Sequence, residues 1–401
     1  MSAGHRLAFA DWLACAARGA REPAAVVARA AGDGLLERIA AAGAAGHVLD
    51  FDDTYAPGLA HLSAPTAPAA LLLATELGAD TGRALAAYAA GFEAMGALTR
   101  ACHPALYDGG WHPTAVCGSA GAAVAAARLI GLDADAERRA IALALLRAGG
   151  LRAAFGSDGK ALQVGLAAAA GVHAARLAAA GAAVDADAIA GAGAGFAEAF
   201  AVATGPATLD AMIAAADAAP AGGRAVAENW IKAYPCCLQT HGAIDAALEV
   251  GAPPPAQATL TVVVHPVSRR AAAIDEVADG LQAKFSIPYL TAYALLRGAP
   301  GLDTFARIDG EVAALARRVR IRTDPALGES EAHLELDGRT AAQITAPRGS
   351  PGNPLDAPAI AAKLRSLAGG ALDGALDDPA RPAAAVAGAA GLLPARAAGP
   401  A

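Results

Sequence analysis

Apolar and polar residues recur with helical spacing over most of the first 250 residues. Alanine and leucine return every three or four positions in residues 66–77, 80–98 and 113–130. Asp133 or Asp135 can cap the next helix, and Lys160 opens another that reaches about residue 180. Gly165 and Gly171 within that helix leave room for close neighbours. The pattern predicts a bundle of small-faced helices.

The period changes after the Pro253-Pro254-Pro255 break. Residues 258–267 alternate as a strand does, 318–323 are strand-like, and 331–345 predict a hairpin around Asp337-Gly338. Two helices are expected between the strands, from Ser286 to Arg297 and over 303–317. The helical pattern returns in 357–368. We therefore predict three segments, in the order helical domain 1–252, α+β domain 253–353, and C-terminal helices 354–401.

Composition narrows the class of protein. Apolar residues make up 55% of the chain and charged residues 17%, but alanine dominates the apolar fraction. We find no run of 18 strongly apolar residues and no signal-peptide layout, which predicts a soluble, cytoplasmic protein without a membrane partner. Five cysteines fit a reducing compartment. The net charge of −7, without a basic run, argues against nucleic acid as a partner.

Lysine is rare in this chain, and its positions draw attention. Only four are present, and Lys160, Lys232 and Lys284 lie within short polar segments. A lysine is a compact cation that suits the binding of carboxylates or the movement of protons. Lys232 is flanked by Trp230 and Tyr234, which indicates a pocket, whereas Lys284 is expected on a solvated face.

Two upstream segments add carboxylates and imidazoles. Asp50, Asp52, Asp53 and Thr54 precede His61, whose imidazole normally titrates near neutral pH. One of the carboxylates can orient that base or take a proton, with Thr54 as a hydrogen-bond donor. The aspartates can instead cap the helix near Pro65. These alternatives stay open on the residues alone.

His112 lies in Gly-Trp-His-Pro-Thr, where a helix is expected to begin. A helix start attracts anions, so His112 can help to hold a carboxylate; a structural role in the loop is the alternative. Lys160 also lies at a helix start, which is unfavourable for a cation unless a partner or ligand compensates. A solvated surface lysine is the alternative.

Other chemistries have weaker support. Cys236 and Cys237 are adjacent, which is poor geometry for tetrahedral zinc, and no cysteine run resembles an iron–sulfur site. The glycines between 191 and 195 lack a surrounding βαβ unit. The residues alone therefore favour neither a zinc site, nor an iron–sulfur site, nor a dinucleotide site.

The ordered segments resemble the MmgE/PrpD family. The residues that carry the resemblance are Asp50-Phe-Asp-Asp-Thr54, His61-Leu-Ser-Ala-Pro, Gly110-Trp-His-Pro-Thr114, Gly159-Lys160, Lys232-Ala-Tyr-Pro-Cys-Cys237 and Phe285-Ser-Ile-Pro-Tyr289. The resemblance implies a mainly α fold, with a large all-helical domain built from both chain ends and an inserted smaller α+β lid. It also implies a homodimer that uses no metal and no organic cofactor.

The same resemblance implies a site and an activity. His61, Asp50, Lys160 and His112 are the expected catalytic residues, and Thr54, Lys232 and Tyr289 the expected substrate-binding residues. The implied reaction is that of a lyase of the 2-methylcitrate dehydratase or cis-aconitate decarboxylase type, acting by acid/base chemistry at a carbon next to a carboxylate of a small di- or tricarboxylate. The stretch between Thr54 and His61 lacks the tryptophan-rich sequence typical of the true 2-methylcitrate dehydratases.

Two alternatives remain. One is an epimerase or isomerase of an amino- or imino-dicarboxylate, which needs acid/base groups on both faces of one carbon. The other is a non-catalytic relative that has kept the fold.

Overall fold

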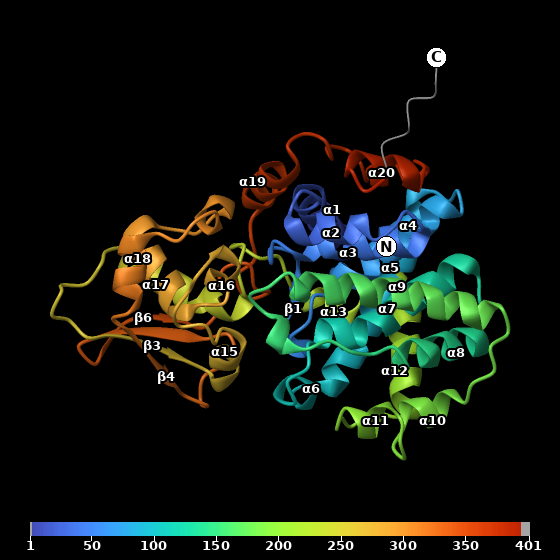
Figure 1. The fold of residues 1–401 in the computed structure, drawn as a ribbon, viewed down its shortest axis with the longest axis horizontal. Helices are drawn as coiled ribbons and strands as arrows, with labels where there is room; N and C mark the ends of the chain where they lie inside the picture. Colours follow the sequence, from blue (N-terminus) through green and yellow to red (C-terminus); the bar gives the residue numbers. More distant parts are fainter. Residues whose placement is uncertain (1, 394–401) are drawn as a thin grey trace.

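The computed structural model describes residues 2–393, and within this range the protein is mainly α (Figure 1). The mainly α prediction is confirmed. The predicted boundaries and the role of a lid stay predictions, and residues 394–401 of the predicted C-terminal segment lie outside the described range.

The first core is built from helices. In chain order these are α1 (Ala3–Gly19), α2 (Pro23–Ala30), α3 (Leu35–His47), α4 (Ser63–Glu76), α5 (Thr81–Cys102), α6 (Ala105–Asp108), α7 (Pro113–Ile130), α8 (Ala134–Leu145), α9 (Gly159–Ala179), α10 (Ala186–Ala190), α11 (Phe196–Ala199), α12 (Pro206–Ala218) and α13 (Arg224–Ala227). α7 lies in the middle and packs against α4, α5, α8 and α9. The expected cap of α8 forms, because the Asp133 side chain accepts a hydrogen bond from the Ala136 N–H.

Glycine allows the close helix packing that the sequence predicts. A Cβ atom added to Gly165 would lie 2.0 Å from the Ala40 carbonyl oxygen of α3. One added to Gly171 would lie 2.4 Å from the Ser119 carbonyl oxygen of α7. A methyl group at either position would therefore push α9 away from its neighbours.

The second core surrounds a four-stranded sheet, at the left of Figure 1. The strands follow the order β4 (Val319–Thr323), β3 (Leu260–Val264), β5 (Ala332–Leu336) and β6 (Arg339–Ile344). β3 runs parallel to β4 and antiparallel to β5. The predicted hairpin joins β5 to β6, with Asp337 and Gly338 both at positive φ. The helices of this part are α14 (His241–Val250), α15 (Pro266–Ala271), α16 (Gly280–Ala283), α17 (Ile287–Arg297) and α18 (Gly310–Ala316).

α14, which precedes the proline break at 253, packs against β5, β6 and α17 and contributes to the second core. One element differs from the sequence prediction. The helix expected over 303–317 is a short 3₁₀ turn, Leu302–Phe305, followed by α18. Asp309 separates the two, because its carboxylate caps the N–H groups of Glu311 and Val312.

The end of the described chain returns to the first core. α19 (Ala357–Ala368) packs against α1, and α20 (Ala383–Ala389) packs against α4, as Figure 1 shows in red above the blue helices. A buried ion pair fastens α19 in place, with Lys363 Nζ 2.7 Å from Asp11 Oδ1 of α1. A two-stranded ribbon of β1 (Thr54–Tyr55) and β2 (Asn229–Trp230) joins distant segments next to the junction of the two cores.

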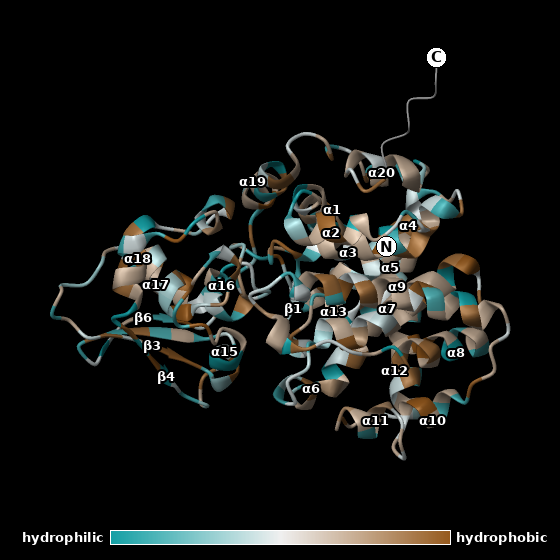
Figure 2. Ribbon diagram, in the orientation of Figure 1, coloured by the Kyte–Doolittle hydropathy of each residue, from teal (hydrophilic) through white to brown (hydrophobic). Residues whose placement is uncertain are grey.

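Hydropathy follows this packing, with apolar residues concentrated where helices meet (Figure 2). Two helices, α7 and α9, are long and apolar enough to cross a membrane by length and composition, contrary to our expectation that no such segment exists. In α7, 89% of the apolar window is buried inside the protein, and in α9, 56%. One or two helices of this kind are weak evidence for a membrane span, because core helices meet the same criteria.

Candidate active site

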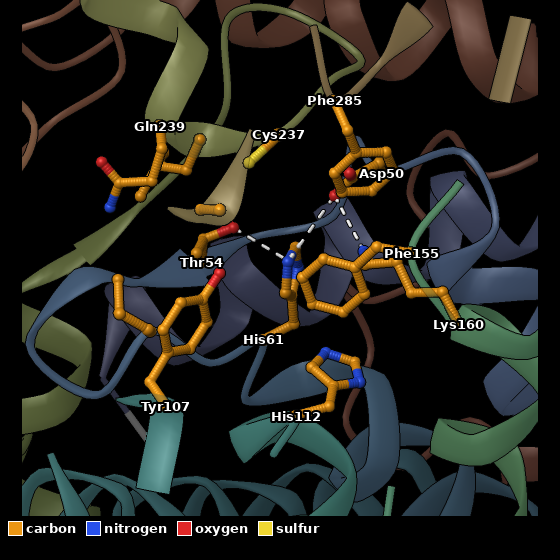
Figure 3. A pocket seen from close by; sticks show the side chains of 13 residues that line it. Asp50, Thr54, His61, Tyr107, His112, Phe155, Lys160, Cys237, Gln239 and Phe285 are labelled. Carbon is orange, nitrogen blue, oxygen red and sulfur yellow. Dashed lines mark hydrogen bonds and ion pairs between the residues drawn. The ribbon is translucent and has the colours of Figure 1, made fainter. Parts of the chain in front are cut away.

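A pocket of about 420 Å³, counted with its open mouth, lies where the two cores meet (Figure 3). One wall comes from the first core and carries Asp50, Thr54, His61, His112 and Lys160. The opposite wall comes mainly from the second core and consists of Cys237, Leu238, Gln239, Ala271 and Phe285. Five of the seven predicted site residues therefore line one pocket.

Asp50 is at the centre of the charged wall. It follows α3 and has a left-handed backbone (φ 53°), which is uncommon for a residue with a Cβ atom. Its Oδ1 accepts hydrogen bonds from Lys232 Nζ at 2.7 Å and Lys160 Nζ at 3.1 Å, and lies 3.6 Å from His61 Nε2. Burial opposes the charge of Asp50, but the two ammonium groups outweigh it and hold the pKa of this carboxyl well below its usual range. Asp50 is therefore an anion at neutral pH.

Lys160 opens α9, where the helix dipole disfavours a cation. The predicted compensation is present, since the ammonium pairs with Asp50 and lies 5.7 and 5.5 Å from the ring centres of Phe155 and Phe285. Those two rings stack with centres 5.3 Å apart. An ammonium has three donors, so Lys160 keeps donors for a ligand in the pocket. The interpretation as a solvated surface lysine is wrong, because the residue is buried.

Lys232 does not line the pocket. Its side chain is completely buried, and Nζ donates to Asp50 Oδ1, to the Asp50 carbonyl at 2.9 Å and to the Cys236 carbonyl at 2.9 Å. These three acceptors use all three donors of the ammonium. The structure therefore gives Lys232 the role of holding Asp50, in place of the predicted contact with substrate.

Tyr289 also lies away from the pocket. It belongs to α17, its ring packs in the second core, and its hydroxyl accepts a hydrogen bond from the Asp309 N–H at 3.0 Å. Ser286 caps α17 and fixes the helix start, which turns Tyr289 into this core. The tyrosine that does line the pocket is Tyr107 of α6.

Lys284 is buried, which corrects the expectation of a solvated face. Its Nζ donates to the Leu49 carbonyl at 2.5 Å. It also lines a neighbouring hollow together with Asp50 and Lys160. Burial lowers the pKa of Lys284 to about 8, so the ammonium form still predominates at pH 7.

His61 is anchored from one side of its ring. Its Nδ1 lies 3.1 Å from Asp52 Oδ2 and 3.3 Å from Thr54 Oγ1, and its main-chain N–H donates to Thr114 Oγ1. The aspartates do not cap a helix, because α4 begins at Ser63 without a capping side chain. Burial lowers the pKa of His61 to about 3, so the imidazole is neutral at pH 7 in the free protein.

His47, near the end of α3, completes a group that the sequence interpretation missed. Its Nδ1 lies 2.9 Å from Asp52 Oδ2, and its ring contacts those of His61 and His112, with centres 4.5 and 5.8 Å apart. Burial lowers the pKa of His47 as well. Burial would raise the pKa of Asp52, but His61 and His47 outweigh this effect and hold that pKa far below its usual range. Asp52 is thus an anionic acceptor shared by two imidazoles.

His47, Asp52 and His61 also form a group that could hold a metal ion. One ligand atom from each of His47, Asp52 and His61 lies within 4.8 Å of the others. The nitrogen–oxygen distances of 2.9 and 3.1 Å are those of hydrogen bonds, and two neutral imidazoles with N–H groups satisfy Asp52 Oδ2 without an ion. An ion at this place would have to replace both of these hydrogen bonds.

His112 is the N-cap residue of α7, as predicted. Its Nδ1 accepts a hydrogen bond from the Gln163 amide at 2.8 Å, and its ring meets Phe155 edge to face. Burial lowers the pKa of His112 far below its usual range, and the nearby Lys160 ammonium adds to the effect. Gln163, Phe155 and Tyr107 were not predicted; Gln163 is an isolated polar residue in an apolar helix, which was the signal available.

The site thus combines ammonium groups, a fixed carboxylate and neutral imidazoles at the junction of a helical part and an α+β part. This fold and site define a protein of the MmgE/PrpD type. The MmgE/PrpD N-terminal domain model matches residues 38–209, and the MmgE/PrpD C-terminal domain model matches residues 234–381. The chain belongs to the MmgE/PrpD family.

Two relatives give a more specific likeness over part of the chain. Cis-aconitate decarboxylase from Homo sapiens is 35% identical over 147 residues, which cover 35% of this chain and 30% of the human protein. Cis-aconitate decarboxylase from Mus musculus is 34% identical over 147 residues, covering 35% of this chain and 29% of the mouse protein. The aligned region spans less than a third of either relative.

Proposed function

We propose that this protein is a lyase that dehydrates or decarboxylates a small di- or tricarboxylate, using acid/base chemistry of its own side chains at a carbon next to a carboxylate. Membership of the MmgE/PrpD family and the partial likeness to cis-aconitate decarboxylases support this class of reaction. The observation that carries the proposal is the one-sided pocket, with every charged or basic lining group on one wall.

Positive charge is in excess around Asp50, counting the ammonium of Lys232 behind the pocket and that of Lys284 in the neighbouring hollow, which favours an anionic substrate. The ammonium groups of Lys160, Lys232 and Lys284 outnumber the carboxylates of Asp50 and Asp52. Lys160 can bind a substrate carboxylate with its free donors, between two aromatic rings that keep water away. In a dry pocket this charge-assisted bond also stabilises the negative charge that develops on the substrate in the transition state.

His61 acts as the base in this proposal. Asp52 holds its Nδ1 side, so Nε2 is left toward Asp50 and the pocket. In a dehydration, Nε2 would take the proton from the carbon next to the carboxylate. The released electron pair would form the double bond, and the hydroxyl group would leave as water with the proton that Nε2 returns to it. One well-placed base contributes roughly 10²–10⁴-fold to the rate, so His61→Gln should lower kcat by this factor.

The epimerase alternative has less support. An epimerase needs a proton donor and a proton acceptor on opposite faces of one carbon. Across the pocket from His61 stand Leu238, Ala271 and Phe285, and the pKa of Cys237 is raised by burial to about 11. The second wall therefore lacks a group that exchanges protons readily at neutral pH.

The experiment is proton NMR in D₂O with citrate, 2-methylcitrate, cis-aconitate and iminodisuccinate. A new alkene signal, or loss of a carboxyl group, that depends on enzyme and disappears in Lys160→Met supports the lyase. Deuterium incorporation with inversion and no new alkene would identify the epimerase instead. Lys363→Met is the matched control, because it removes a buried ammonium of the same kind outside the pocket.

We also propose that the protein is a cytoplasmic homodimer, and α9 offers the contact face. Leu166 and Leu177 are exposed by 64% and 41%, and with Leu162, Ala169, Ala170 and His173 they form one stripe spaced three or four residues apart. The stripe is self-complementary. If the α9 helices of two protomers pack antiparallel with their centres at Ala169 and Ala170, Leu162 of one protomer contacts Leu177 of its partner, and Leu166 contacts His173. All five cysteines are buried free thiols, which fits a reducing compartment.

Light scattering with size-exclusion chromatography tests the dimer. Leu166→Glu should halve the measured mass, whereas Leu77→Glu, at an exposed leucine just after α4, should leave it unchanged. A monomeric wild type, or a dimer that survives Leu166→Glu, would exclude this face.

A further inference from the structure

The two imidazoles that line the pocket carry their protons on different nitrogens. A carboxylate only accepts hydrogen bonds. His61 Nδ1 lies 3.1 Å from Asp52 Oδ2, whereas Nε2 lies 3.6 Å from Asp50 Oδ1, which is beyond hydrogen-bond distance, so Nδ1 bears the proton. Because burial keeps the ring neutral, His61 Nε2 is then a bare acceptor. His112 has a different anchor, and this anchor reverses the arrangement.

The anchor of His112 is the side-chain amide of Gln163, one turn into α9. Gln163 Oε1 accepts a hydrogen bond from the Leu151 N–H at 2.9 Å, and Nε2 donates to the Leu151 carbonyl at 3.2 Å. This two-way pairing fixes which end of the amide is oxygen, because exchanging the ends would place N–H against N–H. The remaining amide hydrogen points at His112 Nδ1, 2.8 Å away.

Leu151 is itself held firmly against the segment that carries His112. It forms a β-bridge with Trp111, the His112 N–H donates to the Gly150 carbonyl, and the Arg152 N–H donates to the Gly110 carbonyl. The amide, the loop and the imidazole therefore form one rigid frame. In this frame His112 Nδ1 is an acceptor, so the proton of the neutral ring is on Nε2.

We propose that Gln163 is a positioning residue that locks His112 in the Nε2–H form, so that the pocket presents one imidazole that accepts a proton, His61, and one that donates a hydrogen bond, His112. The proposal rests on the lyase function proposed above. His112 would donate to the substrate oxygen on which negative charge develops and would keep its proton throughout. Gln163 also prevents the imidazolium form, because a proton on Nδ1 would meet the amide N–H.

Gln163→Glu is the sharpest test, because the side chain keeps its shape but faces His112 Nδ1 with a hydrogen-bond acceptor in place of a donor. A glutamate accepts at both oxygens, so it retains the Leu151 N–H bond but requires a proton on His112 Nδ1. The tautomer is read directly by ¹⁵N NMR of histidine-labelled protein, with His112→Asn used to assign the signals. Wild type should show a protonated Nε2 and a bare Nδ1 at His112, and Gln163→Glu should show a protonated Nδ1.

Activity provides the second readout. Gln163→Glu should lower kcat by about 100-fold with a smaller change in KM, and should add a pH-dependent step near neutrality as His112 becomes able to hold two protons. Gln163→Met, which removes the lock without reversing it, should lose about 10-fold. Gln343→Glu on β6 is the control for added charge, because Gln343 is exposed and belongs to the sheet.

The outcomes separate the two proposals. A wild-type His112 with its proton on Nδ1 overturns the lock, whatever the substrate is, because the NMR measurement needs none. A reversed tautomer in Gln163→Glu with unchanged kcat overturns the positioning role and leaves the lyase intact. A confirmed lock in a protein that turns over none of the four substrates counts against the proposed function alone.

Discussion

Two buried carboxylates in this protein, Asp50 and Asp11, both lose their hydration but differ in the number of lysines that pair with them. Asp50 has two ammonium partners, Lys160 and Lys232, and its pKa lies well below the usual range. Asp11 has one partner, Lys363, and burial raises its pKa because a single cation does not offset the desolvation. The number of counter-charges, and not burial, therefore decides which carboxylate stays ionised.

The comparison also separates function from architecture. The Asp50 cluster lies on the wall of a pocket and keeps ammonium donors available, whereas the pair of Asp11 and Lys363 is closed on all sides and joins α19 to α1. Lys363 further donates to the Phe51 carbonyl and lies over the Phe51 ring, so it ties α19 to the segment just after Asp50. A buried ion pair is thus no evidence for a catalytic site unless a cavity reaches it.

The largest effect is expected from Lys232→Met. This change leaves the Asp50 carboxylate with a single cation, and it leaves the carbonyl groups of Asp50 and Cys236 without their hydrogen-bond donor. The free energy of unfolding should therefore fall by about 3–5 kcal/mol. Urea unfolding followed by circular dichroism measures the loss. A loss below 1 kcal/mol would mean that Lys232 does not compensate Asp50.

A smaller loss is expected from Lys363→Met, about 2 kcal/mol at pH 7, because Asp11 can take up a proton and become neutral. The sign with pH follows from the raised pKa of Asp11. Protonation relieves the unpaired charge as pH falls, so the deficit relative to wild type should shrink at pH 5. Turnover should survive in this variant and be lost in Lys160→Met; equal activity losses in the two would contradict the distinction between them.

The smallest effect concerns a buried group without any counter-charge. Neither ring nitrogen of His241 has a hydrogen-bond partner within the described chain, and burial lowers its pKa to about 3. Such a histidine is protonated only in the unfolded state between about pH 6.5 and 3, so its contribution to stability is present above pH 6.5 and is lost as pH falls.

Between pH 7 and pH 5 the wild type should therefore lose about 1–2 kcal/mol more stability than His241→Phe. Chemical unfolding of both proteins at the two pH values measures this difference. Parallel losses would show that His241 takes up its proton in the folded state.

The sequence was sufficient for elements whose signals are local. The helices at 113–130 and 357–368 and the hairpin at Asp337-Gly338 were predicted closely, because caps, prolines and turn residues fix them from within. The prediction of one continuous helix over 303–317 was wrong, because the Asp309 carboxylate accepts a hydrogen bond from the Glu311 N–H and so begins a new helix there.

The candidate site was predictable where a polar segment interrupts an apolar chain. Asp50, Thr54, His61, His112 and Lys160 stand out in this way, and they line one pocket. The direction in which a side chain points was not predictable. The sequence around Lys232 and Tyr289 also indicated a site, yet Lys232 contacts Asp50 from the side away from the pocket, and Tyr289 packs in the second core. His47 and Gln163 are single polar residues within apolar helices, so only their tertiary partners reveal a role.

The division of the pocket between two cores has a consequence for how this protein can change over generations. The residues assigned to chemistry come from the helical core, and the wall across from them comes from Leu238, Ala271, Phe285 and their neighbours in the second. Mutations in that second wall can reshape the space beside a substrate without disturbing the charged cluster. New substrate preferences can therefore arise by drift in one half of the molecule while the other half preserves the reaction.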